Sequence, residues 1–127
     1  MKRKETNMYY SNYYNKTIKE IDDTLTLAMK ILAKLMLIKS SKADNPSTKC
    51  ERAILITKYT TEYLTVFDYG TNLLIKTIDQ ISSGFNNYSL KELKTSKKHV
   101  EILGDFLKKY QDLNEIFRQK DLPNEIL

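Results

Sequence analysis

The sequence contains few residues that interrupt regular secondary structure. Its 127 residues include only 3 glycines and 2 prolines. A β-sandwich or β-barrel needs a turn about every ten residues, and such turns draw heavily on glycine and proline. The scarcity of both residue types therefore indicates a few long elements rather than many short ones.

Cysteine and histidine each occur once, as Cys50 and His99. A single cysteine excludes a disulfide within the chain and is typical of proteins in a reducing compartment. A zinc site built from cysteine and histidine needs about four such ligands. We expect Cys50 to be buried or half-buried on the first turn of a helix, and His99 to be solvated beside Lys97 and Lys98.

Groupings that support catalysis are also scarce. The three glycines stand far apart, so there is no glycine-rich phosphate loop. No Glu-x-x-His pair of the kind found in di-iron helical bundles includes the one histidine. The sequence therefore predicts a protein that is not an enzyme and that holds no cofactor or metal.

The chain lacks an apolar segment long enough to cross a membrane. Its most apolar stretch, residues 25–38, would form a helix of about 21 Å, against about 30 Å for a bilayer core, and it contains two lysines. Tyr9, Tyr10 and two asparagines interrupt the segment after the basic start, so no signal peptide is expected. We predict a cytoplasmic protein without a membrane span.

The same apolar stretch belongs to a predicted helix from about residue 12 to 41. Apolar residues recur there at spacings of four and three, namely Ile21, Leu25, Ala28, Leu32 and Leu35. A helix at the edge of a bundle needs an apolar face only slightly wider than about 100°. This helix is apolar around most of its circumference, so it needs neighbours on two or three sides.

A second helix is predicted at about 47–83, begun either by Asn45 as cap before Pro46 or by Thr48 with Glu51. Residues 54–69 are rich in β-branched and aromatic types, so a β-hairpin at about 54–78 is the alternative. The helix is favoured by apolar residues spaced by threes and fours: Ile56, Tyr59, Tyr63, Val66 or Phe67, Gly70, Leu74, Ile78 and Ile81.

Two glycines have specific expected roles in this second helix. Gly70, in its interior, would cost about 1 kcal/mol unless a neighbouring helix packs closely against it. Gly84 is expected at its end in the left-handed conformation.

A third helix begins at the capping box of Ser89 and Glu92, with Tyr88 expected to pack on Leu93, and stops before Pro123. Short connections make neighbouring helices antiparallel. We therefore predict an all-α fold, an elongated antiparallel three-helix bundle, with a four-helix bundle as the alternative. Residues 1–10 are expected to form a flexible basic arm, residues 11–122 the single bundle domain, and residues 123–127 a short tail.

The chain is basic, with 21 lysines and arginines, 16 acidic residues and a net charge of +5. A basic arm beside aromatic residues is one way to bind single-stranded nucleic acid. The candidate contacts with nucleic acid or phosphate lie in the arm and on the third helix: Lys2, Arg3, Lys4, Lys91, Lys94, Lys97 and Lys98. Abundant lysine, asparagine, isoleucine and tyrosine also indicate an AT-rich coding sequence, as in a low-GC microbe, its phages or its plasmids.

Surplus apolar helix surface without catalytic groups predicts a non-enzymatic interaction module. Such a protein would be a small regulator, inhibitor or accessory subunit that contacts a protein partner or a second copy of itself, as a homodimer. A basic nucleic-acid-binding accessory protein is the alternative. The residues expected to make helix-packing or oligomer contacts are Leu25, Leu32, Leu35, Tyr59, Tyr63 and Phe117.

Overall fold

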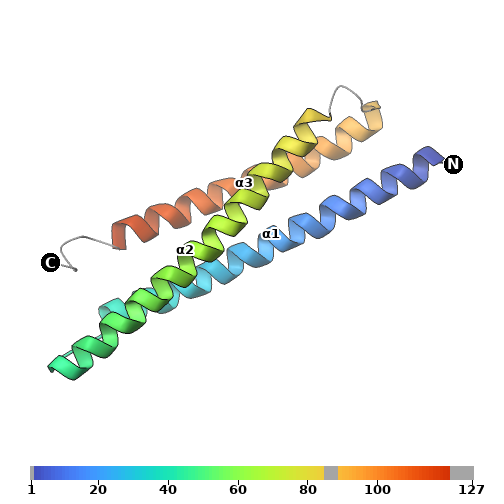
Figure 1. The fold of residues 1–127 in the computed structure, drawn as a ribbon. Helices are drawn as coiled ribbons and strands as arrows, with labels where there is room; N and C mark the ends of the chain where they lie inside the picture. Colours follow the sequence, from blue (N-terminus) through green and yellow to red (C-terminus); the bar gives the residue numbers. More distant parts are fainter. Residues whose placement is uncertain (1, 85–88, 121–127) are drawn as a thin grey trace.

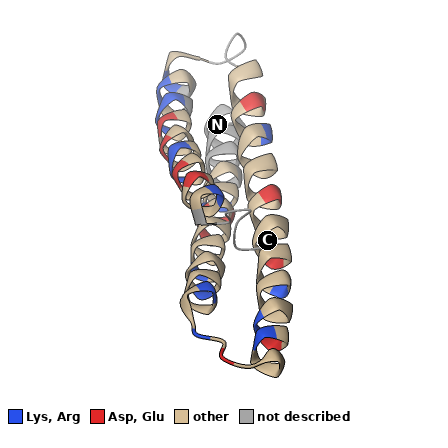
Figure 2. Ribbon diagram, turned by 90° about the vertical axis from the view of Figure 1, so that its left-hand side faces the viewer, with Lys and Arg blue, Asp and Glu red and all other residues tan. Residues whose placement is uncertain are grey.

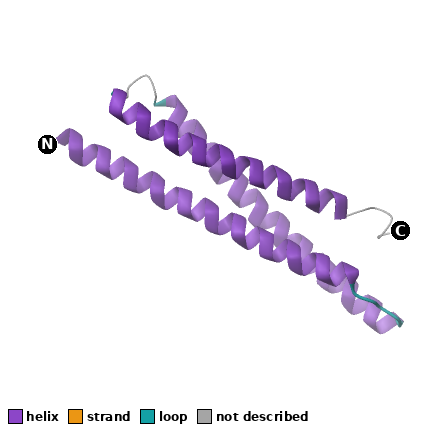
Figure 3. Ribbon diagram, turned by 180° about the vertical axis from the view of Figure 1, so that it is seen from behind, coloured by secondary structure: helices purple, strands orange, loops and turns teal. Residues whose placement is uncertain are grey.

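A computed structural model describes residues 2–84 and 89–120 of the chain. They form three helices, α1 (Lys2–Ser40), α2 (Pro46–Ser83) and α3 (Leu90–Lys120), which run antiparallel to one another in sequence order (Figure 1). The described residues include no strand (Figure 3). The all-α prediction is confirmed, and the alternative with a β-hairpin at 54–78 is wrong.

The first helix is longer than expected. It begins at Lys2 rather than near residue 12, so the backbone predicted as a flexible arm over residues 1–10 is helical from Lys2. Neither glycine nor proline occurs before Pro46, and therefore no residue in this segment breaks the helix. The predicted tail, residues 123–127, lies outside the described residues.

The start of α2 shows which of the two possible caps is used. The side-chain oxygen of Asn45 accepts a hydrogen bond from the backbone N–H of Thr48 at 2.8 Å, and Pro46 occupies the first helical position. This arrangement satisfies one of the N–H groups that have no partner within the helix. Asn45, not Thr48, is therefore the cap.

Threonine hydroxyls explain how a segment rich in β-branched residues remains helical. Thr57, Thr61 and Thr65 each donate to the backbone carbonyl four residues earlier, at 2.9 Å. Their polar groups are thus satisfied within α2, and their methyl groups remain as part of its surface. The β-propensity of these residues does not outweigh the apolar period of three and four.

The turn after α2 differs from expectation. Gly84 has φ −86° and ψ −6°, a right-handed conformation, and so the predicted left-handed cap is wrong. Its N–H still reaches the carbonyl of Ile81 at 3.3 Å and closes the last turn of the helix. The expected packing of Tyr88 on Leu93 lies outside the described residues, as does the side chain of Glu92.

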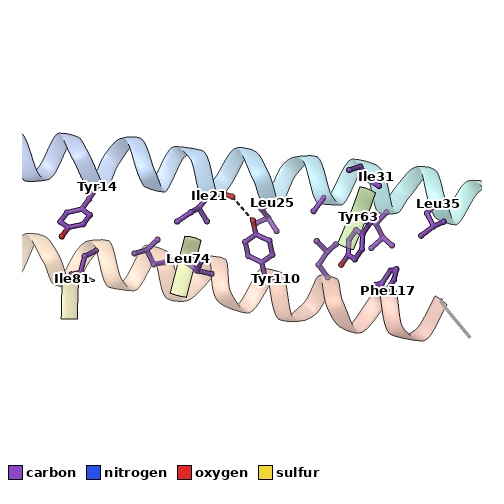
Figure 4. Close-up of a cluster of buried hydrophobic side chains, with 14 residues drawn as sticks. Tyr14, Ile21, Leu25, Ile31, Leu35, Tyr63, Leu74, Ile81, Tyr110 and Phe117 are labelled. Carbon is purple, nitrogen blue, oxygen red and sulfur yellow. Dashed lines mark hydrogen bonds between the residues drawn. The ribbon is translucent and has the colours of Figure 1, made fainter. Parts of the chain in front are cut away.

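The core lies between the three helices and consists mainly of large apolar side chains (Figure 4). Aromatic rings from α2 and α3 meet within it, and the ring centroids of Tyr63 and Phe117 are 4.5 Å apart. The buried members are Tyr14, Ile21, Leu25, Ala28, Ile31, Leu32, Leu35, Tyr63, Leu74, Ile81, Leu103, Tyr110, Leu113 and Phe117.

The three helices do not overlap along the whole length of the bundle. Figure 1 shows α3 ending close to the end of α1, whereas the start of α2 extends beyond both. The contact of Phe117 with Tyr63 places the last turn of α3 opposite the middle of α2. Figure 4 places Phe117 beside Leu35 of α1, so α3 accompanies α1 almost to its end. We call residues 30–60, where α1 and α2 are joined (bottom of Figure 2), the hairpin end.

Candidate interaction surface

The residues predicted to form helix-packing or oligomer contacts lie in the core of this chain. Tyr59 is half-buried, and the other five are buried: Leu25, Leu32, Leu35, Tyr63 and Phe117. They pack α1, α2 and α3 against one another. They therefore do not supply a surface for a second chain.

The predicted lysine face lies on the outside of α3. Lys91, Lys94 and Lys98 are exposed on one face at spacings of three and four, and Lys97 is exposed on another flank. Exposed Asp105 and Asp112 continue the same face at intervals of seven residues. The face therefore changes sign along α3 and is not a continuous positive stripe.

The basic residues at the start of α1 have helical backbone, and their side chains lie outside the described residues; these are Lys2, Arg3 and Lys4. Figure 1 places the start of α1 at the same end of the bundle as the start of α3. Both predicted basic groups therefore lie at the end opposite the hairpin end.

The only histidine is buried, contrary to expectation. His99 is 8% exposed, and its ring centroid lies 6.0 Å from that of Tyr14 on α1. It belongs to the inward row of α3 that also contains Leu103 and Tyr110, a periodicity that two neighbouring lysines obscured. Burial lowers the pKa of His99 from its ordinary value of 6.5.

Cys50 also differs from expectation, because it is exposed. It lies on the first turns of α2, beyond the part of the hairpin that α3 reaches. Among the described residues, no cluster of three or more histidine, cysteine, aspartate or glutamate side chains could hold a metal ion.

The hairpin end carries the net positive charge of the molecule. Residues 30–60 contain two acidic residues, Asp44 and Glu51, and seven basic ones, which gives +5. The rest of the chain has equal numbers of basic and acidic residues, so the hairpin end accounts for the whole net charge of +5. The basic members come from both helices and the connection: Lys30, Lys34, Lys39, Lys42, Lys49, Arg52 and Lys58.

Sequence reasoning missed this cluster because it sought basic residues in the predicted arm and on the third helix. A running sum over about 30 residues would have found it.

Arg52 has a structural role within this cluster. Its guanidinium donates to the backbone carbonyls of Ile38, at 3.1 Å, and of Lys39. Those carbonyls lie in the last turn of α1, where few backbone N–H groups follow to pair with them; that of Ile38 also accepts from the N–H of Ser41 at 3.1 Å. Arg52 therefore joins the end of α1 to the start of α2.

Five of the seven basic side chains are exposed, and two of these lie near a single aromatic ring. The ammonium nitrogens of Lys34 and Lys58 lie 6.0 and 5.5 Å from the ring centroid of Tyr59. The two lysines come from different helices and are held near one site by attraction to the ring face. The exposed lysines that contact no described aromatic ring are Lys30, Lys42 and Lys49.

Large apolar side chains are exposed beside these lysines. Met29 is 54% exposed, Leu37 72% and Ile54 62%. On α1, Met29, the exposed Ala33 and Leu37 follow one another at intervals of four residues and form a continuous row. We call these three residues the apolar row.

Lys30 and Lys34 each follow a member of the apolar row by one position. The two lysines therefore form a basic row directly beside the apolar one.

An open hollow of about 430 Å³ lies along α2 and is lined by Thr65, Asp68, Tyr69, Asn72, Leu73 and Lys76. The hydroxyl of Tyr69 donates to the carboxylate of Glu20 on α1, an interaction that raises the pKa of this tyrosine. All six lining residues belong to α2, so no second element among the described residues lines the hollow. It offers less to a ligand than the hairpin end.

No protein-family model matches this chain, and neither the search of curated proteins nor that of solved structures found a significant match. In the part of the chain that the structure describes, no helix combines the length and the apolar character needed to cross a bilayer.

Proposed function

We propose that this protein is a non-enzymatic interaction module, a small regulator, inhibitor or accessory subunit that binds another protein through its helical surface. The observation that supports this proposal is the apolar row of Met29, Ala33 and Leu37. The buried core does not include these three residues, so their side chains contribute little to the packing of the three helices. Contiguous exposed apolar side chains on a small protein mark contact surfaces.

Affinity purification of the full chain from its native cells tests this proposal. The wild-type protein should recover a partner protein in stoichiometric amount, and Leu37→Ser should lose that partner. Leu90→Ser is the matched control, because Leu37 and Leu90 are both 72% exposed and Leu90 lies at the other end of the bundle. Recovery of no stoichiometric protein, with a monomeric bait, would contradict the proposal.

A second candidate function is nucleic-acid binding by the start of α3. It is supported by the exposure of Lys91, Lys94 and Lys98 on one face. Fluorescence anisotropy with labelled single- and double-stranded oligonucleotides tests it. Binding driven by phosphate contacts should weaken steeply between about 50 and 200 mM salt, and absence of binding at the lower concentration would exclude it.

A further inference from the structure

We propose that the hairpin end binds an acidic amphipathic helix of a partner protein, which lies along the apolar row with its carboxylates against Lys30 and Lys34. This inference rests on the proposed function and names the surface and the chemistry of the partner. Its two supports are the charge of the hairpin end and the pattern of its exposed side chains.

The charge of the hairpin end indicates that the partner is acidic. The hairpin end has a net charge of +5, and its lysines come from α1, α2 and the connection, so the positive potential surrounds this end of the molecule. A second copy bound end to end would place +5 against +5, which like-charge repulsion opposes. An acidic partner is instead attracted and oriented by the same field.

The pattern of exposed side chains on α1 indicates that the partner presents a helix. The apolar row and the basic row lie side by side on α1, with members four residues apart in each. A helix with leucine or isoleucine at intervals of three and four, and aspartate or glutamate on the flank of that stripe, matches both rows. Nucleic acid would match the lysines alone, because phosphates gain nothing from contact with Met29 or Leu37.

The apolar row is exposed because of the side of α1 on which it lies. Figure 4 places Phe117 of α3 beside Leu35, so α3 runs along this part of α1. Met29 is nevertheless 54% exposed and Leu37 72%, so neither α2 nor α3 covers this side of α1. A partner helix there would pack against α1 from outside the three-helix core.

A display experiment tests the inference without knowledge of the natural partner. The probe is a phage library of random 18-residue peptides, selected against the full chain, and enriched sequences are then synthesised and titrated by fluorescence anisotropy. The test variants are Leu37→Ser and the double variant Lys30→Gln with Lys34→Gln. Their matched controls are Leu90→Ser and Lys94→Gln with Lys98→Gln, an equally spaced pair of exposed lysines on α3. Circular dichroism confirms that each variant folds.

We expect enriched peptides to be net acidic, with apolar residues at intervals of three and four. Their affinity should fall by about tenfold or more in each test variant, as for a central interface residue, and change by less than about twofold in the controls. Raising salt from about 50 to 200 mM should also weaken binding, because exposed charges are screened more strongly.

Other results would overturn the inference in distinguishable ways. Enrichment of neutral or basic peptides, or equal losses of affinity in test and control variants, would exclude this surface as the binding site. Either result would leave the proposed function standing. Saturable binding of phosphatidylserine vesicles or oligonucleotides that depends on Lys30 and Lys34, with no enriched peptide, would show a different anionic ligand. A selection that enriches no peptide at all would count against the inference and the proposed function together.

Discussion

The hydroxyl of Tyr110 on α3 lies directly against Gly70 on α2. A Cβ atom at Gly70 would clash with that hydroxyl, and it would lie only 2.8 Å from the ring carbon Cζ and from Cγ2 of Thr24 on α1. Tyr110 is held in place because it is 1% exposed and donates a hydrogen bond to the backbone carbonyl of Ile21 at 3.2 Å. All three helices thus meet at a position where only a hydrogen atom fits.

Gly70→Ala should lower the free energy of unfolding by about 1–3 kcal/mol, because the added methyl group overpacks a site that cannot relax. Gly104→Ala is the matched control. A Cβ there meets no atom within 4 Å, so the higher helix propensity of alanine should raise stability by about 0.5–1 kcal/mol. Urea denaturation of the three proteins measures both changes, and stabilisation by Gly70→Ala would disprove the close contact.

Tyr63→Phe should stabilise the protein by about 1 kcal/mol, because a buried hydroxyl without a partner costs desolvation energy. Tyr63 is fully buried, and its hydroxyl finds no hydrogen-bond partner among the described residues. The same burial raises the pKa of this tyrosine to about 12. Tyr110→Phe provides the comparison: it removes a hydroxyl that does donate, so it should destabilise by about 1 kcal/mol. Thermal and urea unfolding distinguish the two variants, and a loss of stability on Tyr63→Phe would contradict the prediction.

His99 should make stability depend on pH. Its pKa in the folded chain is lowered by burial, so the unfolded chain binds a proton at this site first as the pH falls below about 6.5. The free energy of unfolding should therefore decrease as the pH falls from about 6.5 and should be independent of this group above that pH. In His99→Gln the decrease should be smaller over the same range. An equal decrease in both proteins, measured by urea titrations at several pH values, would assign the effect to other groups.

Arg52→Gln should destabilise the protein by about 1–2 kcal/mol, because two carbonyls in the last turn of α1 lose charge-assisted hydrogen bonds. Arg52→Lys should recover little of this loss, since a single ammonium group does not reproduce two donors in fixed geometry. Hydrogen exchange at residues 36–40 gives the local readout. Unchanged exchange there in Arg52→Gln would show that the end of α1 does not depend on this side chain.

The helices were predictable because their signals are local. Asn45 and Pro46 mark the start of α2, and apolar residues at intervals of three and four mark its buried side. The helical course of 54–78 was harder to predict, because threonine favours strands until its hydroxyl bonds to the preceding turn, as Thr57 does. The extension of α1 to Lys2 was missed because the basic start was expected to form a flexible arm.

The candidate surface could not be predicted in the same way, because it depends on which sides of α1 the other two helices cover. The apolar period of α1 is the same at Leu25 and at Met29, yet one is buried and the other exposed. Only the packing register of three helices distinguishes them. For the same reason Tyr63 and Phe117, expected at a possible interface between chains, were found together in the core.

Hydrogen exchange of the full chain, alone and with the partner recovered from cells, tests the central claim most directly. The start of α2 lies beyond the end of α3, so its amides should exchange faster than those in the middle of α2 in the free protein. With the partner bound, the account predicts slower exchange across residues 30–60 and little change at residues 90–98. Slowing confined to residues 90–98, or none along the chain, would contradict it.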